Sequence, residues 1–229
     1  MTQLNLDFIS SPSWSTDTPG AWSNYSVDAP LVSSVPNAKV QFTSPFTIAA
    51  WIKRTAIDST GRYWLCKDDG LGTNDYAIIS GFGAGTNFAL FSSNDNYIAQ
   101  IACPDTNWNH YAFTYDGTDV VAYMNGSVDS TTTITLTMNV SSGPVVVGSY
   151  LSGTFPGNGN LDDVVLVEQC LDATAIASLF AGTIPTFSTE AAVWKFEEGS
   201  GSTAYDSGYT APAIVRKRIN SRLSLLGVG

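Results

Sequence analysis

The feature of this sequence that most constrains its fold is a series of short apolar stretches separated by turn residues. They follow one another about every ten residues, the spacing of strands in an antiparallel β-sandwich. The stretches predicted to form strands are Phe46–Ile52, Tyr76–Ile79, Phe88–Phe91, Tyr97–Ile101, His110–Tyr115, Val120–Met124, Val145–Val147 and Val164–Val167. The predicted fold class is therefore all-β, an antiparallel sandwich of two sheets.

Two local signals are sharper than the rest. Asn125-Gly126 tolerates positive φ at both central positions of a type I′ turn and predicts a tight hairpin. One short helix is predicted from Asp172 to Ala181, on the C-terminal side of the chain. Asp172 can cap its first amides and Gly182 can end it.

The chain divides into three parts by composition. Residues 1–39 are rich in Ser, Pro and Trp without periodicity and are expected to form an irregular N-terminal cover or attachment segment, with one edge strand near Tyr25–Val27. Residues 40–210 carry the strand signals and are expected to form one domain. Residues 211–229 form a basic tail, with Arg216, Lys217, Arg218 and Arg222 as candidate residues for attachment to an assembly.

Charge and cysteine content exclude several classes of protein. The 10 basic and 20 acidic residues give a net charge of −10, which repels nucleic acid. No apolar run is long enough to span a membrane, so membrane insertion is not expected. The 3 cysteines lack metal-binding spacing and are expected to be free thiols. The N-terminal residues do not resemble a secretory signal, which favours cytoplasmic synthesis.

Three stretches resemble the laminin G-like family of the concanavalin A-like lectin and glucanase superfamily. They are Phe46–Lys53 (FTIAAWIK), the hairpin Trp108–Gly126 with its WNHYA and YMNG ends, and Gly159–Phe180 with its GNLDDV start. This resemblance implies a two-sheet jelly-roll sandwich. A fourth stretch, Trp194–Gly208, resembles the opening strand of that family but comes last here. A permuted closing strand near 191–208 is favoured over the stub of a second, truncated module.

The sequence offers little support for catalysis. Retaining glucanases of this superfamily place two carboxylates on one strand face in an E-x-D-x-x-E pattern, and the glutamates at Glu168, Glu190, Glu197 and Glu198 do not begin such a pattern. The single histidine, His110, lies in an alternating strand and is expected to be a core residue. The protein is therefore expected not to be an enzyme.

The resemblance implies a calcium site where the loops meet, since calcium binds carboxylate, carbonyl and hydroxyl oxygens. Asp162, Asp206 and Ser207 are the candidate ligands. A second acidic loop holds Asp68, Asp69 and Asp75, whose alternative role is to cap solvated turns. Asp163 should point away from Asp162 and lie on the surface.

Aromatic residues in loop-like sequence are candidates for carbohydrate or partner binding, because sugar sites combine aromatic rings with a few polar groups. They are Trp14, Trp22, Tyr25, Tyr150 and Phe155. The alternative is that these rings cover the sandwich or fill a protein interface.

Two functions from different classes remain open, and the first is favoured. In the first, the protein is a capsid decoration or fibre component on a virion surface, with other coat proteins or its own copies as partners, and it presents the jelly roll for adhesion to a host surface or glycan. In the second, it is a secreted or cell-surface lectin module that binds carbohydrate outside the cell. Fold alone does not separate the two.

Overall fold

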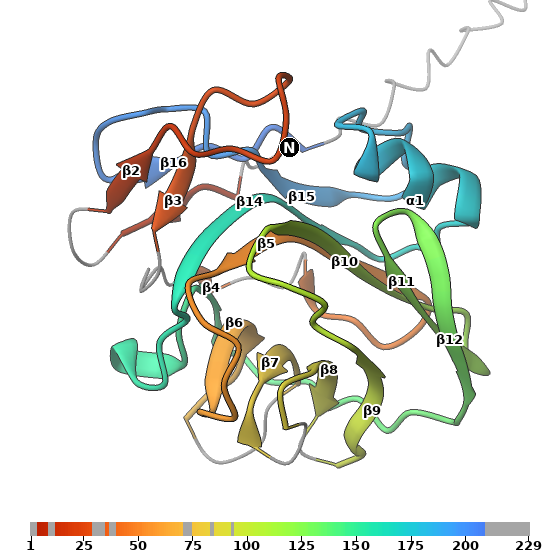
Figure 1. Ribbon diagram of the computed structural model, residues 1–229. Helices are drawn as coiled ribbons and strands as arrows, with labels where there is room; N and C mark the ends of the chain where they lie inside the picture. Colours follow the sequence, from red (N-terminus) through yellow and green to blue (C-terminus); the bar gives the residue numbers. More distant parts are fainter. Residues whose placement is uncertain are drawn as a thin grey trace, which may run out of the picture.

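The structure is a computed structural model that describes residues 4–8, 12–28, 35–36, 40–70, 75–82, 85–92 and 94–208. Two antiparallel sheets stack face to face and form a sandwich (Figure 1). The predicted all-β, two-sheet jelly-roll sandwich with one short helix is therefore confirmed.

The larger sheet has eight strands in the order β12-β11-β10-β5-β14-β3-β2, with β15 also paired to β14. Its strands are β2 (Ser13–Ser15), β3 (Ser26–Asp28), β5 (Phe46–Arg54), β10 (Trp108–Tyr115), β11 (Asp119–Met124), β12 (Ser127–Thr133), β14 (Gly159–Val167) and β15 (Ala191–Trp194). The predicted turn between β11 and β12 is present, with φ of 50° at Asn125 and 78° at Gly126.

The smaller sheet has six strands in the order β4-β13-β6-β7-β8-β9. They are β4 (Val35–Pro36), β6 (Arg62–Lys67), β7 (Tyr76–Ser80), β8 (Phe88–Ser92), β9 (Asn96–Ile101) and β13 (Pro144–Val147). A separate pair joins β1 (Leu6–Asp7) to β16 (Thr203–Ala204).

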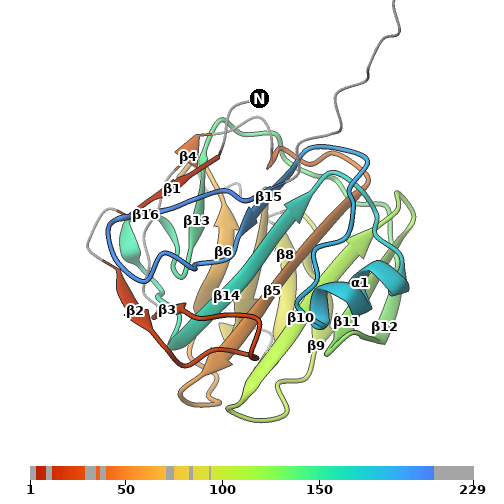
Figure 2. The same cartoon turned by 90° about the horizontal axis from the view of Figure 1, so that it is seen from above.

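The core lies between the two sheets, and strand alternation determines which residues enter it. Along β5, Phe46, Ile48, Ala50 and Ile52 point into this core, whereas Ala49 packs in a second apolar cluster on the other face. That second face lies beneath α1 (Ala173–Phe180), as Figure 2 shows. Helix α1 begins where predicted, because the Asp172 side chain accepts a hydrogen bond from the Ala175 amide.

The N-terminal segment is more regular than predicted. Leu4, Leu6, Phe8 and Val27 are buried in the main core, and β3 pairs with both β2 and β14. The stretch that resembles an opening strand is part of the same sandwich. Strand β15 pairs with β14, and β16 pairs with β1, so residues far apart in sequence lie side by side.

Candidate functional site

Four aromatic side chains gather on the outer face of the six-stranded sheet. They are Tyr63 on β6, Phe82 after β7, and Tyr150 and Phe155 after β13, and together we call them the aromatic cluster. The Tyr63 ring centroid lies 4.8 Å from that of Tyr150 and 5.6 Å from that of Phe82. The Phe82 and Phe155 centroids are 5.3 Å apart. Each ring therefore lies within the range of direct aromatic contact with another.

A closed loop positions two of these rings. The Gly157 amide donates to the Gly148 carbonyl oxygen at 2.9 Å, which brings the two ends of the loop together. Within it, the Tyr150 amide donates to Thr154 at 2.8 Å. The loop is joined to β6 by a hydrogen bond from the Tyr63 amide to the Phe155 carbonyl oxygen at 2.9 Å. The rings of Tyr150 and Phe155 therefore stand on a backbone that is hydrogen-bonded at several points.

Phe82 and Phe155 are both exposed and both have strained backbones. Their side chains are 40% and 50% exposed, and their φ angles are 50° and 47°. A bulky residue at positive φ costs about 1–2 kcal/mol. Gly61 allows the Phe82 ring to approach the backbone closely, since a Cβ at Gly61 would lie 2.4 Å from that ring. Strain at an exposed apolar pair is typical of a binding site.

Polar groups border the aromatic cluster. Asp68 is fully buried, and its Oδ1 accepts a hydrogen bond from the Gly70 amide at 2.5 Å. Burial raises the pKa of Asp68, whereas the neighbouring Tyr150 side chain lowers it. Burial and then Asp68 raise the pKa of Tyr150, so its hydroxyl stays protonated. The site thus offers apolar rings beside a tyrosine hydroxyl that contacts a carboxyl group.

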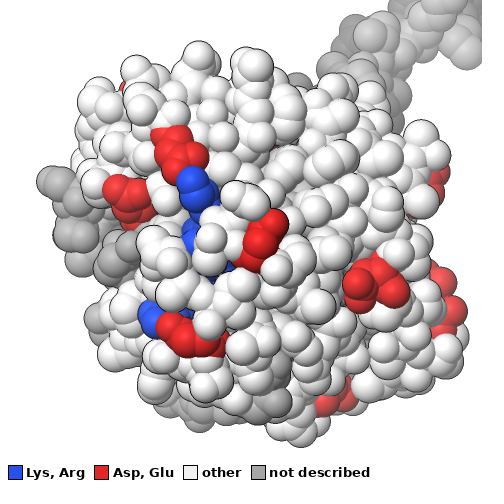
Figure 3. Space-filling model, in the orientation of Figure 1, with Lys and Arg blue, Asp and Glu red and all other residues white. Residues whose placement is uncertain are grey.

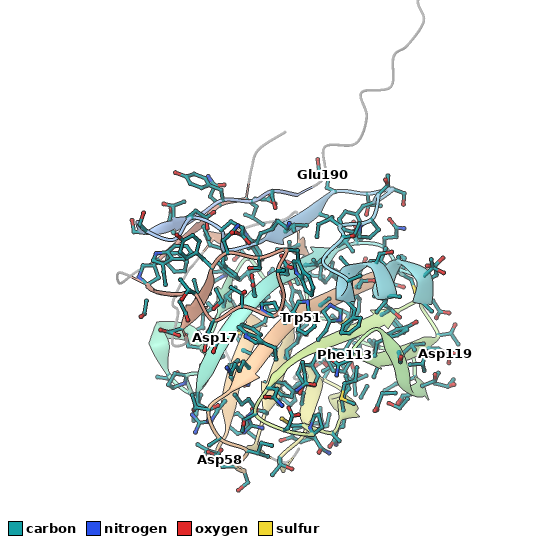
Figure 4. All side chains as sticks on the ribbon, turned by 45° about the horizontal axis from the view of Figure 1, so that its top comes forward. Asp17, Trp51, Asp58, Phe113, Asp119 and Glu190 are labelled. Atoms are coloured by element: carbon teal, nitrogen blue, oxygen red, sulfur yellow. The ribbon has the colours of Figure 1, made fainter. Side chains whose placement is uncertain are left out.

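A second group at the border is the Arg62 guanidinium. Its Nη1 donates to the Pro156 carbonyl oxygen at 3.3 Å, directly after Phe155 in the chain. Its Nη2 donates to Asp58 Oδ2 at 3.2 Å. Asp58 lies in the connection between β5 and β6, at the lower edge of the molecule in Figure 4. This guanidinium is therefore already committed to protein acceptors.

The structure divides the five predicted binding aromatics into two groups. Tyr150 and Phe155 belong to the aromatic cluster, with ring centroids 6.4 Å apart. The other three, Trp14, Trp22 and Tyr25, belong to the segment that packs against the eight-stranded sheet. Carbohydrate or partner binding stays a prediction for all five residues, and Trp22 is 38% exposed.

Trp14, Trp22 and Tyr25 make contacts that fit the alternative role of a cover. Trp14 Nε1 donates to the Gly201 carbonyl oxygen at 3.3 Å. The Trp22 ring lies 5.9 Å from that of Trp51, which Figure 4 places in the middle of the sheet. A Cβ at Gly199 would lie 2.6 Å from the Tyr25 ring. These rings therefore pack on backbone and core residues.

Sequence reasoning missed Tyr63 and Phe82. Tyr63 lies on β6, a strand that the periodicity did not predict. Phe82 lies between Gly81 and Gly83, in a stretch interpreted only as a loop. An aromatic residue flanked by glycines in a loop-like stretch is a signal that could have identified Phe82 as exposed.

The predicted calcium ligands occupy two different settings. Asp162 accepts hydrogen bonds from Ser23 Oγ at 2.7 Å and from the Asp163 amide at 2.8 Å. Burial, followed by the charge of Asp163, raises the pKa of Asp162 to about 8. A carboxyl that is mostly protonated at neutral pH is a poor calcium ligand unless the metal displaces the proton.

Asp206 and Ser207 lie together at β15. Asp206 accepts hydrogen bonds from the Val193 amide and from the Leu4 amide, each at 3.0 Å, and Ser207 Oγ donates to the Val193 carbonyl oxygen at 3.1 Å. Within the described ranges, no group of three or more His, Cys, Asp or Glu side chains is placed to hold a metal ion. Calcium binding therefore stays a prediction.

Two expectations about aspartates were wrong. Asp163 is only 5% exposed, and its Oδ2 accepts a hydrogen bond from Trp22 Nε1 at 3.3 Å. A bulge in the pairing of β14 with β5, with φ of 45° at Asp163, turns this residue under the N-terminal segment. Asp75 is also buried, and it pairs with Lys67 at 2.6 Å, so it does not cap a solvated turn.

His110 is a core residue, as predicted. It is buried, and its ring lies 5.4 Å from that of Trp51 and 6.3 Å from that of Phe180. Burial lowers its pKa to about 3, which keeps the imidazole neutral. The candidate assembly residues Arg216, Lys217, Arg218 and Arg222 lie outside the described residues.

The described surface has little charge on the face seen in Figure 3. Lys and Arg side chains stand beside Asp and Glu in one strip, and most of the remaining face is uncharged. The ion pairs Lys53–Asp17 and Arg62–Asp58 show the same pairing of opposite charges. No helix among the described residues has the length and apolar character needed to cross a bilayer.

A family model of the concanavalin A-like lectin/glucanases superfamily matches residues 31–177, which is more than half of the chain. The protein belongs to the concanavalin A-like lectin/glucanases superfamily, as the laminin G-like motifs implied. Among curated protein sequences, none matches this chain.

Solved structures share the fold at low sequence identity. Domain 4 of AbnA, a GH43 extracellular arabinanase from Geobacillus stearothermophilus, was solved in complex with arabinotriose. It matches with a TM-score of 0.59 and 15% identity over 74% of this chain and 81% of that one. A candidate carbohydrate-binding protein from Bacteroides ovatus matches with a TM-score of 0.58 and 14% identity, over 93% and 61% of the two chains.

A Trypanosoma rangeli sialidase also shares the fold, with a TM-score of 0.51 and 13% identity, over 68% of this chain and 27% of that chain. At such identities, these likenesses show a common fold. The fold is thus of the lectin type, in a class whose members include separate binding proteins and parts of enzymes.

Proposed function

We propose that this protein is a non-enzymatic carbohydrate-binding module whose sugar site is the aromatic cluster. The observation that carries this proposal is the pair Phe82 and Phe155, two exposed rings 5.3 Å apart on strained backbones. The C–H faces of sugars pack on such rings, and neighbouring polar groups fix the orientation of the ligand. The Tyr150 hydroxyl beside Asp68 is such a group.

The comparisons support a glycan as the ligand. The arabinanase domain was solved with arabinotriose, and the Bacteroides protein is a candidate carbohydrate-binding protein. Both have the fold of this chain over most of its length. Because their identity to it is at most 15%, the aromatic cluster and the fold together, and not shared binding residues, support the proposal.

A binding role without catalysis fits the roles of the described acidic residues. Glu197 accepts hydrogen bonds from the backbone and side-chain nitrogens of Asn24. Glu198 accepts one from the Tyr205 amide at 2.8 Å. Asp162 and Asp206 hold backbone segments together, as described above. Each of these carboxylates already has a structural role that a general acid or nucleophile would have to give up.

The biological setting is a separate proposal. Display on a virion surface, as a capsid decoration or fibre component, would place the aromatic cluster where it could contact host glycans. Partners in this setting would be other coat proteins or further copies of the chain. Fractionation of the native source tests it, since stoichiometric recovery with intact particles is expected. Absence from particles would favour an extracellular lectin module.

The experiment that tests sugar binding is a glycan array followed by calorimetry on the best ligand. Phe82→Ala and Phe155→Ala should each weaken binding at least tenfold, because truncating an aromatic anchor removes about 1.4 kcal/mol or more. Tyr205→Ala is the matched control, since Tyr205 is 56% exposed and lies outside the aromatic cluster. Unchanged affinity in both phenylalanine variants would refute the assignment of this site.

A further inference from the structure

We propose that Lys67 and Asp75 react with each other in the folded protein and become joined by an amide bond between Lys67 Nζ and Asp75 Cγ. The observation that carries this proposal is a lysine ammonium group 2.6 Å from a carboxylate oxygen, with both side chains fully buried. An amide and one water molecule are the products that these two groups form without any other reactant. The inference is a site of covalent modification and does not depend on sugar binding.

The backbone holds the two residues against each other. Strands β6 and β7 run side by side in the six-stranded sheet (Figure 1), with Lys67 paired to Tyr76. Lys67 is the last residue of β6, and its carbonyl oxygen accepts a hydrogen bond from the Asp75 amide at 2.9 Å. The two side chains therefore begin at neighbouring points of the sheet. Holding two reacting groups in one geometry makes their reaction intramolecular and lowers its barrier.

Hydrogen-bond donors surround one oxygen of the Asp75 carboxylate. Besides Lys67 Nζ, Asp75 Oδ2 accepts hydrogen bonds from Gln41 Nε2 at 3.0 Å, from Ser141 Oγ at 2.9 Å and from the Ser141 amide at 3.3 Å. Asp75 Oδ1 is buried and has no hydrogen-bond partner among the described residues. Donors stabilise the negative charge that builds up on an oxygen as its bond to carbon breaks. Oδ2 is therefore the oxygen that leaves, and Oδ1 is the oxygen that the amide keeps.

Ser141 offers a route for the protons, because its hydroxyl touches both reacting groups. Lys67 Nζ donates to Ser141 Oγ at 3.3 Å, and Oγ donates to Asp75 Oδ2. One proton passes from the ammonium group to the carboxylate and leaves a neutral amine. The lone pair of Nζ then forms a bond to Cγ, the bond from Cγ to Oδ2 breaks, and a second proton from nitrogen completes the departing water. The amide nitrogen keeps the third proton, so atoms and charges balance.

Burial favours the amide over the ion pair. Two charges taken out of water carry a large desolvation cost, whereas an amide carries no charge. The same burial keeps water away from the bond once it has formed. Lys53 and Asp17 form the contrasting pair, since their side chains are 32% and 47% exposed. Solvent stabilises both charges there, and no bond is expected between them.

The test is the mass of the full chain, measured in denaturant after the folded protein has been incubated for increasing times. Linked molecules are lighter by one water molecule, and their fraction should grow with incubation. Trypsin gives a second readout, because it does not cleave after a lysine whose Nζ is an amide. The next basic residue after Lys67 is Lys195, so linked chains should yield the fragment 63–195, lighter by one water. A chain incubated in denaturant should form no such fragment.

Three variants assign the reacting groups. Lys67→Met should abolish the lighter species, and Lys53→Met, the matched change in the exposed pair, should leave its rate of formation unchanged. Ser141→Ala should slow its formation by about tenfold or more, because positioned proton-transfer groups contribute factors of about 100 or more. An unchanged rate in Ser141→Ala would refute the role given to this hydroxyl.

The wild-type measurement decides the proposal even if a variant fails to fold. A chain that keeps its full mass and is cleaved after Lys67 following weeks of incubation would overturn it. A lighter chain that is still cleaved after Lys67 would overturn it as well. The water would then have been lost elsewhere, as by ring closure at Asp69-Gly70 or Asp116-Gly117.

Discussion

Phe82 and Phe155 approach each other from two different loops, with ring centroids 5.3 Å apart and ring planes inclined at 63°. Both residues keep positive φ in this arrangement. Edge-to-face aromatic contacts contribute about 0.5–1.5 kcal/mol beyond the burial of apolar surface. That range is similar to the strain of one such backbone, so the contact between the two rings does not by itself offset the strain of both residues.

Because of this strain, a glycine variant at residue 155 should be more stable than an alanine variant, which is the reverse of the usual order. At ordinary positions alanine is more stable than glycine by about 0.5–1 kcal/mol, but alanine keeps the strain of positive φ and glycine does not. Phe155→Gly should therefore be about 1 kcal/mol more stable than Phe155→Ala in urea denaturation. The control is Val128, exposed on β12, where the alanine variant should be the more stable one. The same order at both positions would refute the role of strain.

A buried ion pair joins Lys67 and Asp75, with both side chains fully buried and Nζ 2.6 Å from Oδ2. Asp75 Oδ2 also accepts hydrogen bonds from Gln41 Nε2 and Ser141 Oγ, so the pair links β6 and β7 to two distant loops. Removing one partner of such a pair leaves a buried charge uncompensated.

Asp75→Leu should accordingly lower the free energy of unfolding by about 3–5 kcal/mol. The double variant Lys67→Met/Asp75→Leu should recover part of this loss, because no charge then remains buried. Equilibrium denaturation of the two single variants and the double variant measures the coupling. Strictly additive losses would show that the two charges do not stabilise each other.

How much of the fold the sequence could predict depends on how regular each strand is. Strands β5, β10 and β11 contain long apolar runs and were predicted within a few residues of their bounds. Strand β6 was missed because a bulge between Tyr63 and Leu65 breaks its alternation. Strand β12 contains mostly polar residues and gave no apolar signal of its own beyond the turn before it.

The candidate site was only half predictable for a related reason. The exposure of Phe155 and the partial exposure of Tyr150 follow from their loop-like surroundings. Their meeting with Tyr63 depends on contacts between segments far apart in sequence, including the bridge between Tyr63 and Pro156. No local pattern encodes that contact. Asp163 shows the same limit, since alternation predicted an exposed residue and the bulge in β14 buried it.

The raised pKa of Asp162 predicts that stability depends on pH. Its pKa is about 8 in the folded protein, whereas an aspartate in an unfolded chain titrates near 4. Between these values the folded state binds more protons than the unfolded state, so the contribution to stability falls as pH rises from about 4 to 8. The slope can reach about 1.4 kcal/mol per pH unit.

Asp162→Asn should flatten this dependence, because asparagine keeps a neutral side chain at the Ser23 contact. Thermal denaturation at pH 5 and pH 8 measures it, with Asp119→Asn as a control at a surface aspartate. The wild-type protein should lose more stability between these pH values than Asp162→Asn does. A parallel loss in both proteins would mean that Asp162 is already ionised in the folded state.

His110 should show the opposite dependence at lower pH. Its pKa is lowered to about 3 by burial, against about 6.5 in an unfolded chain. The unfolded state therefore binds the extra proton below pH 6.5, and this contribution to stability is lost as pH falls toward 3. Because the chain has 1 histidine, its imidazole resonance in an NMR titration is unambiguous. That resonance should not shift between pH 5 and pH 8, and a midpoint near 6.5 in the folded protein would show that water reaches the ring between Trp51 and Phe180.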